Sequence, residues 1–122
     1  MKVQCFEDLL AWREARELTR EIYELTRSVS WARDLRLVGQ LRSSSASVMA
    51  NVAEGFERHS AREFHQFLCV AKGSCAEVRS YLYVAQDAGL IKQEDFRRLM
   101  NRADAVSRIV GALRAAVERA RK

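Results

Sequence analysis

Residues 93–122, QEDFRRLMNRADAVSRIVGALRAAVERARK, carry the most regular hydrophobic pattern in the chain and decide its fold class. Apolar side chains recur there at alternating spacings of three and four residues: Phe96, Leu99, Ala103, Val106, Val110, Leu113 and Val117. This alternation places them on one face of an α-helix and is typical of the buried seam of helix bundles. It predicts a helix over about residues 93–120, with acidic side chains in its first turn.

Three further segments carry a helical pattern, and we expect helices at about residues 7–28, 35–57 and 61–88. The stripe of the first helix consists of Ala11, Ala15, Leu18, Ile22, Leu25 and Val29. Asp34 and Ser60 are the expected N-caps, and Gly89 is expected to end the third helix. Short connections between long helices make neighbours antiparallel. The sequence therefore predicts an all-α domain over residues 1–122, an up-down-up-down antiparallel four-helix bundle.

The chain has 122 residues, no proline and a formal net charge of +5 from 21 basic and 16 acidic side chains. Seventeen of the basic residues are arginine, and the surplus lies after residue 34. This asymmetry fits a polyanionic partner, although a solvated basic surface explains it equally well. Three cysteines without a CxxC pair fit reduced thiols. With no signal-like or membrane-spanning run, we expect a cytoplasmic protein that does not enter membranes.

Small side chains form a second stripe on the third helix, apart from its core-facing residues: Cys69, Gly73, Ala76 and Ser80. The second helix carries a similar stripe that includes Ala46 and Ala50. Since one amphipathic helix buries one face, a second small face predicts a second packing partner, such as another copy of the chain. Trp12 and Tyr23 flank the first stripe and are candidate interface anchors. The alternative is that one compact monomer uses all of these faces.

Arginines on the fourth helix are the candidate nucleic-acid contacts. Arg97, Arg108 and Arg119 recur every 11 residues and form a line about 33 Å long, at 1.5 Å per residue. Arg98 and Arg102 form a second, shorter ridge. Guanidinium groups in a row suit successive phosphates. The predicted nucleic-acid-binding residues are Arg97, Arg98, Arg102, Arg108, Arg42 and Arg58.

The sequence lacks a catalytic motif, so we expect no enzyme activity, no cofactor and no metal. His65 and Cys69 are four residues apart on the third helix and supply only half of a metal site. We interpret this pair as a surface histidine and a small polarizable side chain.

Several segments resemble one protein family. They are Phe6-Glu7-Asp8-Leu9, Glu21-Ile22-Tyr23-Glu24-Leu25-Thr26, Asn51-Val52-Ala53-Glu54-Gly55-Phe56 and Ala71-Lys72-Gly73-Ser74. In these residues the chain resembles the four-helix-bundle family of 23S rRNA intervening-sequence proteins. That family is similar to the accessory variability determinant protein of bacterial diversity-generating retroelements. Asn51, Glu54 and Gly55 form the most recognisable motif, whereas Met49 stands where the family often has proline.

The resemblance implies a bacterial cytoplasmic bundle that assembles as a pentamer with a basic surface. It also implies nucleic-acid binding and a reverse-transcriptase partner for the retroelement relatives. We therefore expect a non-enzymatic homo-oligomer that binds RNA or DNA through arginines with little sequence specificity. The alternative is a protein-interaction scaffold, for example for a reverse transcriptase, that does not bind nucleic acid directly.

Overall fold

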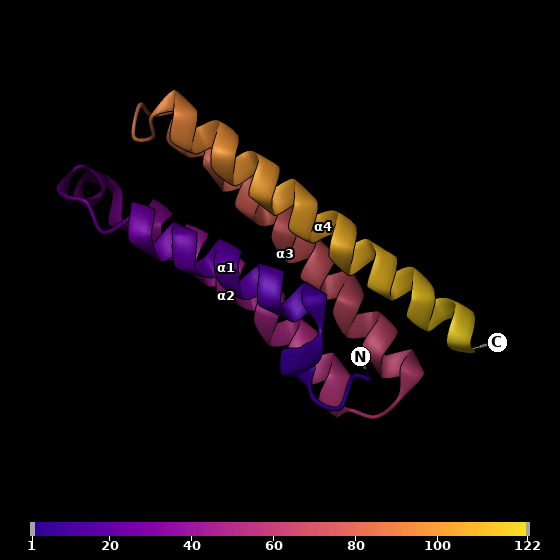
Figure 1. The fold of residues 1–122 in the computed structure, drawn as a ribbon. Helices are drawn as coiled ribbons and strands as arrows, with labels where there is room; N and C mark the ends of the chain where they lie inside the picture. The colour runs from indigo at the N-terminus through magenta and orange to yellow at the C-terminus, as the bar shows by residue number, and fades with distance from the viewer. Residues whose placement is uncertain (1, 122) are drawn as a thin grey trace.

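The computed structural model describes residues 2–121, which form four α-helices and two short 3-10 helices and, within that range, no β-strand (Figure 1). Met1 and Lys122, the two ends of the expected domain, lie outside the described residues. The elements are η1 (Phe6–Asp8), α1 (Leu10–Leu25), η2 (Val29–Asp34), α2 (Leu35–Glu57), α3 (Ala61–Asp87) and α4 (Gln93–Arg121).

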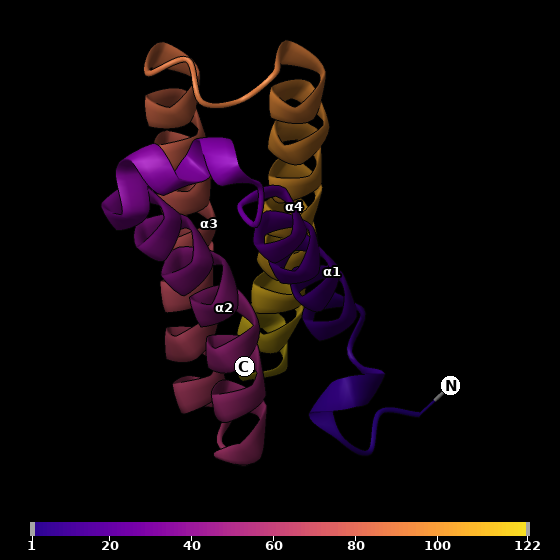
Figure 2. The same cartoon turned by 90° about the vertical axis from the view of Figure 1, so that its left-hand side faces the viewer.

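The four helices form an antiparallel bundle in which each helix packs against two others (Figures 1 and 2). The neighbours are α1 with α2, α2 with α3, α3 with α4, and α4 with α1. η2 and the connection between α3 and α4 lie at one end of the bundle, and the turn between α2 and α3 lies at the other (Figure 2). The predicted four-helix bundle is thus confirmed. Among residues 2–121, no helix is both long enough and apolar enough to cross a membrane.

The first helix is shorter than the expected range of 7–28. At its N-terminal side, the Asp8 carboxylate accepts hydrogen bonds from the backbone N–H groups of Gln4 and Cys5, at 2.9 and 3.3 Å. These bonds fold Phe6–Asp8 into a separate turn, and the extended backbone of Leu9 divides it from α1. α1 then ends at Leu25, so Val29 leaves the stripe and is 87% exposed.

The other three helices differ from their expected bounds by one residue at most, because the local caps form. The Asp34 carboxylate accepts from the Leu37 N–H at 3.0 Å, and the Ser60 hydroxyl accepts from the Glu63 N–H at 3.3 Å. Gly89 has φ +70, where a Cβ would be strained, and the Leu90 N–H behind it bonds to the Ala85 carbonyl at 2.9 Å.

The core is made of the stripes that the periodicity identifies. Its largest side chains that are fully or almost fully buried are Trp31, Leu18, Ile22, Leu41, Leu68, Leu82 and Leu99, with the valines Val48, Val52, Val78, Val106 and Val110. Trp31 is the buried residue of η2, and η2 lies at the end of the bundle opposite the α2–α3 turn (Figure 2). Leu113 and Val117 are only partly buried. They lie on the last turns of α4, which has 29 residues, whereas α1 has 16.

Two glycines of α2 differ in the space around them and give a matched test of the packing. A Cβ on Gly55 would lie 2.7 Å from Phe67 Cβ and 2.9 Å from Phe64 Cδ1, whereas a Cβ on Gly39 would meet nothing within 4 Å. Overpacking lowers the free energy of unfolding by about 1–3 kcal/mol, whereas replacing a helical glycine with alanine raises it by about 1 kcal/mol.

Gly55→Ala should therefore lower the free energy of unfolding by about 1 kcal/mol or more, whereas Gly39→Ala should raise it by about 0.5–1 kcal/mol. Urea unfolding followed by circular dichroism measures both variants. Equal effects at the two positions would contradict the close α2–α3 contact at Gly55.

Candidate nucleic-acid interface and assembly face

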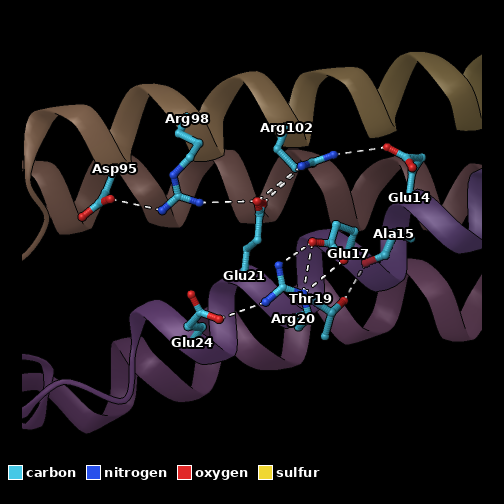
Figure 3. Close-up of polar contacts among 10 residues, drawn as sticks. All are labelled: Glu14, Ala15, Glu17, Thr19, Arg20, Glu21, Glu24, Asp95, Arg98 and Arg102. Atoms are coloured by element: carbon cyan, nitrogen blue, oxygen red, sulfur yellow. Dashed lines mark hydrogen bonds and ion pairs between the residues drawn. The ribbon is translucent and has the colours of Figure 1, made fainter.

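The ridge that contains Arg98 and Arg102 faces α1 and is engaged there by carboxylates (Figure 3). Arg102 donates to Glu21 through Nε at 3.2 Å and through Nη2 at 3.4 Å, and to Glu14 at 3.2 Å. Arg98 donates to Glu21 at 3.4 Å and to Asp95 at 3.1 Å. Three carboxylates therefore surround two guanidinium groups. This ridge joins two helices and offers no surplus positive charge.

Glu21 is the centre of this network and is only 9% exposed. A carboxylate so deep in a bundle requires several charge-assisted hydrogen bonds, and the two arginines supply them. Hydrogen bonding to Glu21 is the main cause that raises the pKa of Arg102 above its ordinary value, so this guanidinium remains charged. The four residues Arg98, Arg102, Glu14 and Glu21 thus form a cross-brace between α1 and α4, and Asp95 adds an ion pair within α4.

Arg42 and Arg58 also contact side chains of their own chain. Arg42 donates from Nε to the Thr26 hydroxyl at 2.9 Å, and its guanidinium lies over the Tyr23 ring, 4.6 Å from the ring centroid. It therefore fastens α2 to the C-terminal end of α1. Arg58 forms ion pairs with Glu54 at 3.0 Å and with Glu63 at 3.6 Å, on the two sides of the α2–α3 turn.

The outward face of α4 presents different arginines. Arg97 and Arg119 are exposed and, within residues 2–121, form no ion pair. Arg108 lies between them, is 73% exposed, and pairs with Asp104 one turn away, at 2.7 Å. We call these three residues the α4 arginine row. Because α4 is one continuous helix from Gln93 to Arg121, residues that are 11 apart lie on the same side of it.

The small-residue stripe of α3 is exposed over its whole length. Cys69, Gly73, Ala76 and Ser80 all face solvent in the protomer. Larger apolar side chains stand beside them on the same helix: Val70 at 53% exposure, Tyr83 at 52% and Val84 at 47%. A Cβ on Gly73 would meet nothing within 4 Å. No contact within the described protomer thus requires glycine at this position, although glycine costs about 1 kcal/mol in a helix.

The outer surface of α2 next to this stripe is also poor in charge. Gly39, Gln40, Ser43 and Ala50 are exposed there. We call these residues, together with Cys69, Val70, Gly73, Ala76, Ser80, Tyr83 and Val84, the uncharged face. The exposed Glu77, seven residues from both Val70 and Val84, interrupts it with one carboxylate. A charged outer surface is the usual state of a solvated bundle helix, so this face is unusual. The sequence pattern identified its small residues but not Tyr83 and Val84, whose spacing along α3 continues the stripe, or Val70, which follows Cys69 directly.

Trp12 and Tyr23 have partners within the protomer. The Trp12 ring meets the Phe6 ring edge-on at 5.2 Å between centroids, and Arg16 lies 5.6 Å from its centroid. Tyr23 is covered by Arg42. Both aromatic rings therefore fasten local elements, η1 to α1 and α2 to α1.

The motif residues Asn51, Glu54 and Gly55 hold α2 against α3. Asn51 donates from Nδ2 to the carbonyl and the hydroxyl of Ser47, at 2.8 and 3.0 Å, and the Ser47 hydroxyl lies 2.9 Å from that of Ser74 on α3. Gly55 admits the phenylalanines of α3, and Glu54 pairs with an arginine of the turn. This recognisable segment is therefore explained by packing.

His65 and Cys69 lie side by side, with 3.9 Å between Nδ1 and Sγ. Across the described range, His, Cys, Asp and Glu side chains do not gather in threes that would hold a metal ion. Surface pockets lie at the η2 end, where Leu25, Trp31, Leu90 and Lys92 line one of about 240 Å³.

The fold and its Asn-x-Ala-Glu-Gly segment define a class of small helical-bundle proteins. The family model described as 23S rRNA-intervening sequence protein matches residues 7–112, which include parts of all four helices, and the chain belongs to that family. The matched range contains Arg97 and Arg108 and ends before Arg119. Comparison with curated proteins gives no match.

Proposed function

We propose that this protein is a non-enzymatic, self-associating bundle that binds RNA or DNA in the cytoplasm through the α4 arginine row. The observation that carries the proposal is the division of the arginines. Arg98, Arg102, Arg42 and Arg58 are held by side chains of their own chain at helix contacts or at the α2–α3 turn, and Arg108, 73% exposed, pairs with Asp104 on its own helix. Arg97 forms no ion pair within residues 2–121 and lies in line with Arg108 and Arg119 on the exposed side of α4. Outward guanidinium groups keep their charge and donors available for phosphate.

Binding of this kind is mainly electrostatic. Arginine contacts to phosphates release counterions and carry no sequence information, so affinity falls with salt and differs little between sequences. The family description names 23S rRNA, which makes RNA the first probe. Self-association strengthens the effect, because five copies with a net charge of +5 each would place about +25 on one particle.

The uncharged face is the surface we assign to self-association, with a pentamer as the proposed state. Its exposed glycine and alanine let another helix approach closely, and its exposed tyrosine and valines supply apolar area. This face lies on α2 and α3, whereas the arginine row lies on the outer surface of α4. Assembly through α2 and α3 would therefore leave the arginines of each copy accessible.

The second candidate function is a protein-interaction scaffold, and the uncharged face is the observation that favours it. A different protein, such as a reverse transcriptase, would then cover Val70, Tyr83 and Val84 in place of another copy. Such a complex would depend little on salt, because apolar contacts are not screened.

The arginine row is tested by Arg97→Gln/Arg108→Gln/Arg119→Gln, titrated by fluorescence anisotropy against labelled single- and double-stranded RNA and DNA. We expect weaker binding to every sequence and a smaller dependence of log K on log salt, by about 0.9 per lost phosphate contact.

The matched control is Arg27→Gln/Arg36→Gln/Arg62→Gln, which removes the same charge from exposed positions outside α4 that form no ion pair within residues 2–121. Equal losses of affinity in the two triple variants would mean that binding depends on net charge alone and would contradict a specific role for α4. Unchanged binding by the α4 variant would refute the assignment outright.

Self-association is tested by Ala76→Glu, with Ala112→Glu on the exposed surface of α4 as the control. Both changes put a carboxylate on an exposed helix position, so neither should unfold the protomer. We expect Ala76→Glu to reduce the mass measured by light scattering to that of one chain, because it would bury an unpaired charge at the interface. A wild-type protein that is already monomeric would remove the assembly proposal and favour the scaffold.

A further inference from the structure

Cys69 belongs to a group of reactive side chains that the proposed function does not use. Its sulfur lies 3.9 Å from Nδ1 of His65 and 3.8 Å from Nη1 of Arg114. On the other side of the imidazole, Nε2 lies 3.3 Å from the Glu118 carboxylate. The residues come from α3 and α4, so the packing of these two helices creates the group.

This order of side chains is that of an activated nucleophile: a thiol, a base within reach, and an acid that orients the base. A neutral His65 that carries its hydrogen on Nε2, the nitrogen beside the Glu118 carboxylate, presents the Nδ1 lone pair to the thiol. After proton transfer, the Glu118 carboxylate stabilises the imidazolium. The Arg114 guanidinium adds positive charge beside the sulfur, where negative charge develops.

The other two cysteines provide an internal comparison. Cys5 is also exposed, but desolvation and then its hydrogen bond to Asp8 raise the pKa of its thiol. Burial raises the pKa of the Cys75 thiol to about 11 and removes it from solvent. Cys69 is thus the exposed thiol with cationic and basic neighbours, whereas the neighbours of Cys5 are acidic.

We propose that Cys69 is a thiol–disulfide exchange site that accepts one half of a small anionic disulfide, of the glutathione disulfide class. The Cys69 sulfur attacks one sulfur of the disulfide, and its proton passes to Nδ1 of His65. The old S–S bond breaks as the new one forms. The released half leaves as a thiolate and takes up a proton, so Cys69 is oxidised as that half is reduced.

The surroundings select an anionic reagent. Arg114 of α4 lies beside the thiol, whereas Lys72 of α3 donates to the Ser107 carbonyl at 3.3 Å and extends over Gly111, where a Cβ would lie 3.1 Å from its Nζ. Exposed Gly73, one turn from Cys69, leaves open space beside the sulfur for the added group. A carboxylate of the disulfide can therefore meet the Arg114 guanidinium beside the sulfur.

This site also bears on the proposed self-association, and that part rests on the proposed function. Cys69 lies in the uncharged face, so a bound peptide-sized group and a second copy of the chain would exclude each other. By linkage, modification should favour the single chain, and a high protein concentration should slow modification.

The test is the rate at which glutathione disulfide modifies each cysteine, followed by mass spectrometry of peptides from the intact protein at low concentration. We expect Cys69 to react on the order of tenfold faster than Cys5. Arg114→Gln and His65→Gln should each lower this ratio toward one. Arg36→Gln, which removes a charge at the other end of the bundle, should leave the ratio unchanged.

Equal rates at Cys5 and Cys69 in the wild type would overturn the proposal, as would an Arg114→Gln variant that reacts like the wild type. Circular dichroism of each variant separates lost reactivity from lost fold. Light scattering on the same samples reports self-association independently. A reactive Cys69 in a protein that is monomeric at all concentrations would refute the proposed assembly and leave the exchange site standing.

Discussion

The contact between Glu21 of α1 and the two arginines of α4 decides how the charges of this bundle are used. Glu21 is almost buried, so its carboxylate must be matched by charged donors. Arg98 and Arg102 meet that need, and their position orients α4 about its own axis. Arg97 and Arg108 then face away from α1. The surface available to a polyanion is thus a consequence of an interaction inside the bundle.

Much of the fold followed from the sequence because the patterns that specify helices are local. The spacing of Leu99, Ala103, Val106 and Val110 fixes a helix and its buried face without reference to any other segment. The caps at Asp34 and Ser60 are equally local. The first helix was predicted too long because the turn at Phe6–Asp8 depends on a single carboxylate and its bonds to two backbone N–H groups. That contact leaves no periodic signal.

The candidate site was harder to predict because it depends on which helices become neighbours. Sequence spacing placed Arg98 and Arg102 on a different ridge from Arg97 and Arg108 but predicted the same nucleic-acid-binding role for both ridges. Only the α1–α4 contact distinguishes what the two ridges do. A signal did exist: Glu14 and Glu21 are seven residues apart on α1 and share a face, as do Arg98 and Arg102 on α4. Pairing these two faces would have identified the cross-brace. The contact of Arg114 with Cys69 spans 45 residues of sequence and has no such signal.

The central claim is that the arginines of α4 are divided between holding the fold and facing a partner. It is tested most directly by comparing the unfolding free energies of Arg102→Gln and Arg97→Gln in urea. The account predicts a loss of about 1–3 kcal/mol for Arg102→Gln, because Glu21 is left buried with fewer donors. For Arg97→Gln it predicts a change within about 0.5 kcal/mol. Equal effects of the two substitutions would contradict the division.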